Sequence, residues 1–490
     1  MGRLSSEKTL GFVAAAVALS CCIAAFHGQL SPDYGSGFFS TNGAAYCGRI
    51  VTNLLDYPAE VTHLGAPLFV LEGQDRAEPL VLHYTNHPPA YYGLLAMLAA
   101  PFDGSPLALK GIAIFFHVAT ALGLASIFLP LRPYAALASG VLAATLPAAS
   151  HYGFMCSAFG PSTLLTVLAL WALTRKSDDR IARWTLHCTL VLAGMLDWNS
   201  ILLIPCVVLA ALGLRRPRVA AEAALLGLMG MVLMALHVRW ILGSWSAIEV
   251  ELTRLSSGAL VASTTSTSGW WEGMWSQWES LFGAPALVLA LIQLCVGREM
   301  PHALRWLALL PGLLLIALFS THAVQHEYWS QALLPAVALL AGGLLGEGLA
   351  SRFRWLRYAA LSLLVILAAQ GLMRASQCLA RDLHPDGTRE FARALDAATQ
   401  PGDVVLFVEQ HREGLCAHTT KQILTGFDSM EKVHLAASST GELVPRLGNA
   451  RLVLVRPRDW PDSKFTLDLE RLAPSTSFGP VAIHDLTPRR

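Results

Sequence analysis

The chain has 490 residues, of which 54% are hydrophobic and 14% are charged, and its mean hydropathy is +0.49. A water-soluble globular protein carries about 25% charged residues, so the composition excludes a soluble multidomain enzyme. A net charge of +1 also excludes the charge excess of a nucleic-acid-binding or basic membrane-surface protein. Apolar runs long enough to cross a bilayer recur along the first three quarters, and they predict a polytopic α-helical membrane protein with about 11 to 13 spans.

The first apolar run covers residues 9–26, and we interpret it as a membrane span rather than a signal peptide. It is long for the apolar core of a signal peptide, and no clear small-x-small cleavage site follows it. Arg3 and Lys8 precede the run. The positive-inside rule therefore places the N-terminus in the cytoplasm and the loop that follows outside.

That loop, residues 28–89, is far longer than an ordinary connection. Its acids are Asp33, Asp56, Glu60, Glu72, Asp75 and Glu78. A Gly/Asn-rich turn is expected at 40–43 and an amphipathic helix in the plane of the interface at 44–55. That helix would carry Ile50, Val51, Leu54 and Leu55 on one side and Arg49 and Asn53 on another. The loop ends in YTNHPPAYY (84–92), where two prolines start the next helix and His87 lies at interface depth.

Four basic clusters mark loops between later spans: Arg175/Lys176/Arg180/Arg183, Arg215/Arg216/Arg218, Arg298/Arg305 and Arg352/Arg354/Arg357. The last three predict cytoplasmic loops, external loops at 243–279 and 320–330, and a last span at 355–373 that leads outward. If segments 88–102, 107–130, 132–149 and 154–174 each cross once, however, the first cluster falls outside. Either 88–102 is re-entrant, or 184–214 is one crossing rather than a hairpin.

The external loop 243–279 is rich in tryptophan. Trp271, Trp275 and Trp278 follow i, i+4, i+7 spacing, so they share one face of a helix. We interpret this face as an aromatic anchor at the membrane surface, with a sugar-stacking platform as the alternative.

From residue 376 onward the apolar runs shorten and charges become frequent, which predicts a soluble extracytoplasmic α/β domain over 376–490 after a membrane domain over 1–375. Helices are expected at 387–400 and 441–447, and strands at 404–408 and 451–455. The domain contains neither GxGxxG nor a P-loop, so no cofactor is assigned to it. We interpret it as a module for packing or for docking the acceptor.

Four segments carry a resemblance to a known family: FFSTNGAAYCGRIVTNLL (38–55), YTNHPPAYYGLLAMLAAPF (84–102), LAGMLDWNSILLIP (192–205) and HEYWSQALLPAVALL (326–340). Their order, after a first span and a long acidic outer loop, resembles the GT-C superfamily of membrane glycosyltransferases. The relevant branch includes the protein O-mannosyltransferases, the lipid A aminoarabinose transferases and the RgtA/B/C/D-like enzymes. The resemblance implies an inverting glycosyltransferase of the plasma (inner) membrane. It would move a sugar from a polyprenyl-phosphate donor to a lipid, glycan or protein acceptor on the outer face.

Such a transfer needs a carboxylate that takes the proton of the acceptor hydroxyl. The resemblance places this acid soon after the first span, where Asp33 stands, with Asp56 and Asp75 as alternatives. Many relatives carry the acid nearer the Asn-Gly turn, where this chain has Ser40 and Thr41. Asp197 is the second candidate, because an acid within an apolar segment is costly and therefore suggests a function. A solvated turn for Asp33 and a helix cap for Asp197 are the structural alternatives.

The departing phosphate needs hydrogen-bond donors or positive charge. Arg239, near the outer end of the run 219–242, suits phosphate because its planar group donates two parallel hydrogen bonds. Snorkelling to lipid headgroups is its alternative role. The other residues expected to bind substrate are Asn42, Arg49, His87, Trp198, His326, Glu327 and Tyr328. His326 and Glu327 form the only suggestion of a divalent metal, and the sequence does not require one.

Two other classes of function are compatible with a polytopic chain, namely a transporter or lipid flippase and a non-catalytic assembly protein of the cell envelope. A transporter lines its pathway with polar residues inside the membrane. Here few acids or bases occur in the middle of a predicted span, and polar and aromatic residues gather in the outer loops. The distribution therefore favours chemistry at the membrane surface.

Overall fold

A computed structural model describes residues 11, 14–20, 22, 38–71, 80–83, 88–129, 132–153, 155–176, 178–246, 249, 267–297, 300–325, 327–382, 388–399, 404–407, 423–425, 452–457, 470–471, 475–478 and 481–486. Of the predicted first span, 9–26, the described residues are helical. The chain divides into two compact units. The first comprises 1–30, 86–91 and 110–379, and the second comprises 31–85, 92–109 and 380–490.

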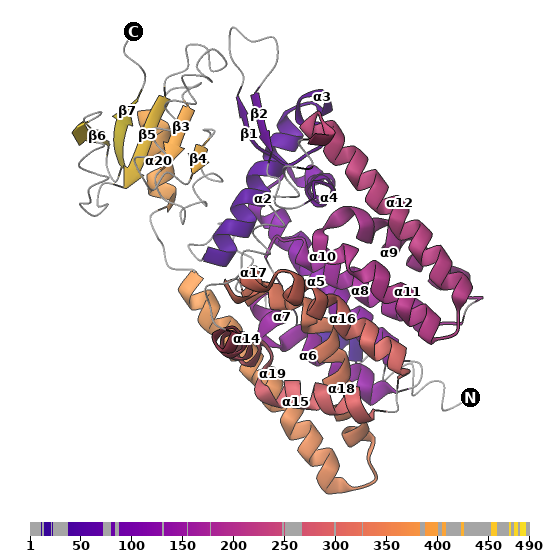
Figure 1. The fold of residues 1–490 in the computed structure, drawn as a ribbon. Helices are drawn as coiled ribbons and strands as arrows, with labels where there is room; N and C mark the ends of the chain where they lie inside the picture. Colours follow the sequence, from indigo (N-terminus) through magenta and orange to yellow (C-terminus); the bar gives the residue numbers. More distant parts are fainter. Residues whose placement is uncertain are drawn as a thin grey trace. The chain divides into compact units, whose positions relative to one another are not determined.

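The first unit is helical (Figure 1). Its elements, two of which continue into the second unit, are α5 (Pro106–Phe128), α6 (Pro133–Thr145), α7 (Pro147–Tyr152), α8 (Phe159–Thr174), α9 (Arg180–Leu196), α10 (Trp198–Ile201), α11 (Leu203–Gly213), α12 (Pro217–Leu242), α14 (Thr267–Phe282), α15 (Ala284–Val296), α16 (His302–Leu318), α17 (Ser320–Gln325), η3 (Glu327–Leu333), α18 (Leu334–Ala350) and α19 (Arg354–Asp382).

Several of these helices can cross a bilayer. In the part of the chain that the structure describes, four helical segments are long and apolar enough: 106–128, 217–242, 328–350 and 354–374. The pair α14 and α15 is a fifth if it counts as one broken span, and five further apolar helices are shorter. The prediction of a polytopic α-helical membrane fold is confirmed, as is the last span at 355–373. The number of 11 to 13 crossings stays a prediction.

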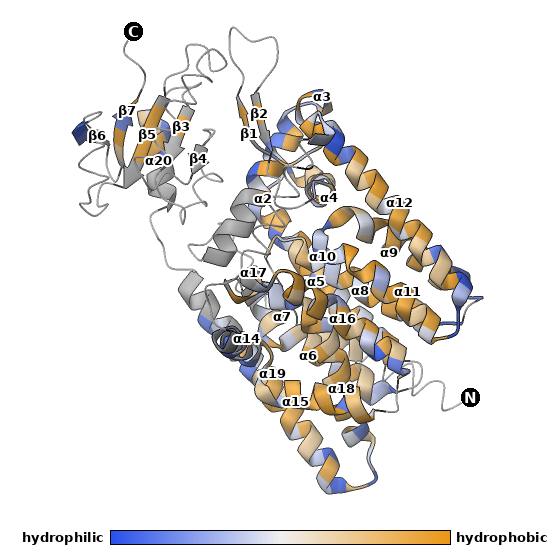
Figure 2. Cartoon of the chain, viewed as in Figure 1, coloured by the Kyte–Doolittle hydropathy of each residue, from blue (hydrophilic) through white to orange (hydrophobic). Residues whose placement is uncertain are grey.

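The basic loops of this unit gather at one end, which we call the basic end. Arg175 donates from Nη2 to the carbonyl oxygen of Ser126 in α5 (3.4 Å), and Arg216 donates from Nη1 to that of Leu173 in α8 (3.1 Å). Arg305, at the start of α16, donates to the carbonyl oxygen of Gln293 at the end of α15 (2.8 Å). Figure 2 shows the turns after α11 and α18 in the blue of hydrophilic residues.

This arrangement decides between the two alternatives for residues 88–214, namely a re-entrant segment at 88–102 or a single crossing at 184–214. The loop before α9 and the loop after α11 both lie at the basic end, so α9 and α11 form a hairpin whose turn is α10. The reading of 184–214 as a single crossing is therefore wrong. In the second unit α4 (Ala90–Ala99) has 10 residues and continues into η2 (Ala100–Phe102). A helix of that length is about 15 Å long, too short for a hydrocarbon core of about 30 Å.

Glycine lets α9 and α12 pack backbone against backbone. A Cβ built on Gly194 of α9 would lie 2.7 Å from the backbone nitrogen of Met231. One built on Gly230 of α12 would overlap the carbonyl oxygen of Val191. Since both helices run from the basic end toward the other end, this contact fixes their heights relative to each other.

A sharp bend separates α14 from α15. The two helices meet at 98°, and Gly283 between them has φ +77°, a conformation that favours glycine. The three tryptophans lie in α14, so their i, i+4, i+7 spacing places them on one face of that helix as predicted, but they are not equally exposed. Trp271 and Trp275 are exposed, but Trp278 turns inward and donates from Nε1 to Ser330 Oγ (3.2 Å). The anchor interpretation applies to the exposed pair.

The described part of the first loop lies in the second unit. The helix α2 (Phe38–Asp56) begins before the predicted helix, so the predicted turn at 40–43 is wrong. The cost of one glycine in a helix, about 1 kcal/mol, is small enough for packing to override. Asn53 is also buried rather than on a polar face, because its Nδ2 donates to the carbonyl oxygen of Pro67 (2.8 Å). Pro67 starts the antiparallel pair β1 (Pro67–Leu71) and β2 (Leu80–His83), and the short α3 (Ala59–Thr62) precedes it.

The C-terminal part has a five-stranded sheet in the order β4-β3-β5-β7-β6. Its strands are β3 (Val404–Phe407), β4 (Ile423–Thr425), β5 (Leu452–Pro457), β6 (Ser475–Phe478) and β7 (Val481–Asp485). Strands β4, β3 and β5 are parallel, and the other pairs are antiparallel. Leu395 of α20 (Thr388–Ala398) packs on Val405 and Val453. The predicted helix at 387–400 and strands at 404–408 and 451–455 are confirmed, whereas 441–447 lies outside the described residues.

The substitution Gly230→Ala tests the contact between α9 and α12. We expect it to destabilise the protein by about 1–3 kcal/mol, because the new methyl group meets the backbone of Val191. Gly111→Ala in α5 is the control, since a Cβ there has nothing within 4 Å. Thermal unfolding in detergent measures both variants. Equal midpoints for the two would contradict the backbone contact.

Candidate functional site

Asp197 stands at the break between α9 and α10, at the end of the helix hairpin away from the basic end. Its side chain is 2% exposed and accepts a hydrogen bond from the backbone of Ser200. In return Ser200 Oγ accepts from the Asp197 backbone N–H (3.1 Å) and donates to the Ala193 carbonyl oxygen (2.8 Å). This capping box holds the carboxylate in one orientation.

Aromatic side chains lie beside Asp197. Tyr328, the second residue of η3, lies in the same region, because α10, which Asp197 caps, and η3 both pack against α8. Its ring packs edge-on against Phe159 at the start of α8 (5.6 Å between centroids) and lies 6.4 Å from the ring of Tyr152. Trp329 continues the cluster, 5.8 Å from Phe159. Asp197 is therefore buried in the same region of the protein as a cluster of flat rings, a kind of surface suited to a sugar or an isoprenoid chain.

Lys110 brings a cation to the same end. It lies in the first turns of α5, is 4% exposed, and its charge acts on the thiol of Cys156, between Tyr152 and Phe159 in the chain. Sequence reasoning missed this residue, although one charged side chain in an apolar run was a usable indication. An ammonium group at this depth must have partners, and it can meet a bound anion.

The structure brings together some of the predicted residues and not others. Asp197, Trp198 and Tyr328 belong to one region of the first unit. Arg239 lies in the same unit but in the last turn of α12, where its guanidinium is 6.0 Å from the centre of the Trp245 ring. Arg49 is buried in α2 of the second unit.

The remaining predicted residues are less fully described. Asp33, Asp75, His87 and His326 lie outside the described residues, and only the backbone of Asn42 and of Glu327 is described. Among the side chains that the structure does describe, no three of His, Cys, Asp or Glu are grouped as a metal site requires.

No family model and no curated protein matches the sequence. Solved structures do match the fold. ArnT from Cupriavidus metallidurans, bound to undecaprenyl phosphate, matches with a TM-score of 0.60 and 12% identity over 98% of both chains. Archaeal oligosaccharyltransferase AglB from Archaeoglobus fulgidus matches with a TM-score of 0.54 and 12% identity over 99% of this chain and 75% of AglB.

A third match is the arabinofuranosyltransferase AftD from Mycobacteria, with a TM-score of 0.56 and 16% identity. It covers 98% of this chain and 40% of AftD. This chain is therefore a multi-pass membrane protein with a membrane glycosyltransferase fold. More particularly, the fold is that of the GT-C glycosyltransferases, over nearly the whole chain, and the predicted resemblance is confirmed at the level of fold.

Two substitutions at Asp197 measure how much its helix cap contributes to stability, apart from any role of its negative charge. Asn caps a helix as well as Asp does, whereas Ala cannot, so Asp197→Ala should cost about 1 kcal/mol more than Asp197→Asn. Thermal unfolding of the purified proteins in detergent measures the difference. If both variants unfold at the wild-type midpoint, the capping box contributes nothing to stability.

Proposed function

We propose that this chain is an inverting glycosyltransferase that moves a sugar from a polyprenyl-phosphate donor to an acceptor on the extracytoplasmic face. The observation that carries the proposal is the buried carboxylate of Asp197 beside the ring cluster of Tyr328, Phe159 and Tyr152, within a GT-C fold. One protein with this fold is bound to undecaprenyl phosphate and another to dolichol phosphate. A lipid-linked donor is therefore the substrate class that we assign.

The face of the membrane follows from the distribution of charge. The loops around Arg175, Arg216 and Arg305 share one end of the first unit, and the positive-inside rule assigns that end to the cytoplasm. Asp197 and Tyr328 then belong to the extracytoplasmic side. We assign the protein to the plasma (inner) membrane.

In the proposed reaction an acceptor hydroxyl attacks the anomeric carbon as the bond from that carbon to the lipid phosphate breaks. A carboxylate takes the hydroxyl proton, and the single displacement inverts the configuration. The candidates for this base are Asp33, with Asp56 and Asp75 as its alternatives, and Asp197. The resemblance in sequence supports Asp33, and the burial of Asp197 beside the ring cluster supports Asp197.

The leaving phosphate gains negative charge as the sugar departs, so a fixed cation beside it lowers the barrier. Lys110 is the candidate best supported by position, because it is buried and shares its surroundings with Cys156 and the adjacent ring cluster. Arg239 lies in the last turn of α12, about 13 Å along the helix beyond Gly230. We assign Arg239 to the first capture of the phosphate and Lys110 to its stabilisation during transfer.

The direct test is transfer of label from radiolabelled polyprenyl-phosphate sugars to an acceptor in membranes that contain the protein. We expect labelled product with the wild type and at least a 100-fold loss in whichever of Asp33→Asn and Asp197→Asn removes the base. Asp178→Asn, at the basic end, is the matched control and should retain activity. Transport of intact donor into vesicles, with no covalent product from any donor, would contradict the proposed function and favour a transporter.

Lys110→Met tests the leaving-group cation in the same assay. Removal of one such donor typically lowers kcat by about 100- to 1000-fold. Arg239→Gln should instead raise the KM for the donor and change kcat less, because it acts before the transition state. Wild-type kinetics for Lys110→Met would show that the phosphate is stabilised elsewhere.

A further inference from the structure

A polar cavity lies at the basic end, far from Asp197. It has a volume of about 370 Å³ and lies among the end of α8, the start of α9 and the turn from α11 to α12. The charged groups that dominate its wall are Lys176, Arg183, Arg215, Arg216, Arg218 and Glu222. We call this cavity the basic pocket. Since α9 has 17 residues, the pocket is about 25 Å from Asp197 and is not part of the proposed catalytic site.

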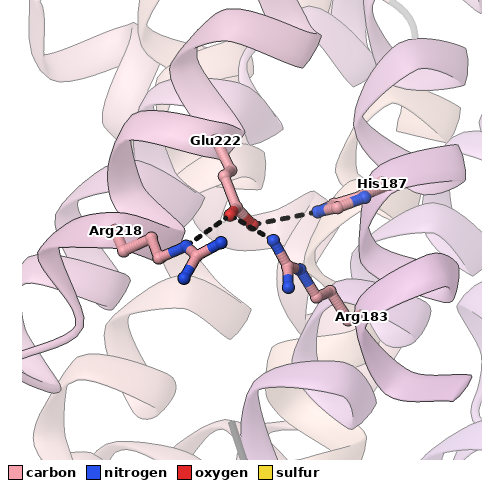
Figure 3. Close-up of polar contacts among 4 residues, drawn as sticks. All are labelled: Arg183, His187, Arg218 and Glu222. Carbon is pink, nitrogen blue, oxygen red and sulfur yellow. Dashed lines mark hydrogen bonds and ion pairs between the residues drawn. The ribbon is translucent and has the colours of Figure 1, made fainter. Parts of the chain in front are cut away.

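Glu222 orders two of the cations (Figure 3). Its carboxylate accepts from Arg183 Nη2 (2.5 Å) and from Arg218 Nε (3.1 Å) and lies 3.1 Å from His187 Nε2. Because Arg183 comes from α9 and Arg218 from α12, the carboxylate ties the two helices together at the pocket. The guanidinium groups are thereby held in place before any ligand binds.

The charges in the basic pocket are not balanced. Its five cations face two carboxylates, those of Glu222 and Asp179, and Asp179 already caps α9 by accepting from the Ala182 N–H (3.1 Å). Among the described residues, no acid forms an ion pair with Lys176 or Arg215. The excess positive charge is therefore available to an anion.

An apolar groove lies on the other side of α9, because Ile181, Cys188 and Leu192 are turned away from Arg183 and Leu186 in the helix. It has a volume of about 590 Å³ and runs between α8 and α9, lined by Leu165, Leu168, Ile181, Trp184 and Leu192, with Arg180 at its basic end. Ile181 and Trp184 are 73% and 60% exposed, which is favourable only against lipid. The groove and the basic pocket share no lining residue, so α9 presents cations on one side and an apolar, lipid-facing surface on the other.

We propose that the basic pocket binds the phosphate headgroup of an anionic phospholipid whose acyl chains lie in the surrounding bilayer. Arginine forks match phosphate oxygens two at a time, and basic pockets between membrane helices are suited to such headgroups. The lipid is structural or regulatory rather than the sugar donor, because it lies at the opposite end of α9 from Asp197. The inference does not rest on the proposed function.

The test is native mass spectrometry of the detergent-purified full chain titrated with phosphatidylglycerol or with phosphatidylcholine. We expect one phosphatidylglycerol to be retained in preference to phosphatidylcholine. The double substitution Lys176→Gln/Arg215→Gln should weaken that binding about 10- to 30-fold, since each cation near a lipid headgroup contributes roughly a factor of five. The matched control is Arg352→Gln/Arg354→Gln, which removes two cations from the same end outside the pocket and should leave the affinity unchanged.

Other outcomes overturn the proposal. Equal retention of the two lipids, or equal loss of phosphatidylglycerol in both double variants, would mean that binding reflects only the general charge of the basic end. Displacement of phosphatidylglycerol by millimolar inorganic phosphate would assign the pocket to a free anion. Elution profiles and thermal midpoints in detergent show whether each variant is folded. If the pocket variant is unfolded, the single substitution Arg215→Gln replaces it, with the same expected direction.

Discussion

Charged side chains and unpaired backbone groups are expensive inside a bilayer, and this cost decides where the chain keeps its few charges. The basic residues of the loops gather at one end of the helices of the first unit, where Arg175, Arg216 and Arg305 also satisfy carbonyl oxygens at helix ends. Among the residues that the structure describes, Lys110 is a buried cation toward the opposite end. This separation of charge determines the orientation that we propose for the helices in the membrane. It also gives the two ends of the unit different kinds of polar side chain.

The candidate catalytic residues lie where helices are interrupted. Asp197 separates α9 from α10, and Tyr328 lies in the 3-10 helix before α18. An interruption leaves backbone groups without helical partners, and the fold satisfies those at Asp197 with the side chain of Ser200. The same break that must be capped also places a buried carboxylate in the region of the ring cluster. The residues at this break therefore satisfy the unpaired backbone groups and also belong to the proposed catalytic site.

Elements with a continuous local pattern could be predicted from the sequence. The span at 355–373 is an uninterrupted apolar run, and the strands at Val404 and Leu452 are β-branched runs of the right length. The extent of α2 could not be predicted, because the helix tolerates Gly43 and buries Asn53 against Pro67, fourteen residues away. Trp278 likewise turns inward only because Ser330 lies beside it in the fold.

The candidate site could be predicted in part. Asp197 is recognisable as an acid in an apolar segment, and Tyr328 comes from the resemblance in sequence, but their proximity depends on how η3 packs against α8. Whether 184–214 was one crossing or two depended on a contact between Arg216 and Leu173, which no local pattern encodes.

The lengths of the lipid-facing helices have a consequence for the membrane itself. Helix α15 has 13 residues, about 20 Å, and exposes Val288, Leu291 and Val296, whereas α12 has 26 residues, about 39 Å, and exposes Leu225 and Leu236. A bilayer core of about 30 Å matches neither length. A short helix such as α15 favours a thinner bilayer, while a long helix such as α12 tilts or projects into the headgroups. We therefore expect the hydrocarbon core to be thinner beside α15 than beside α12.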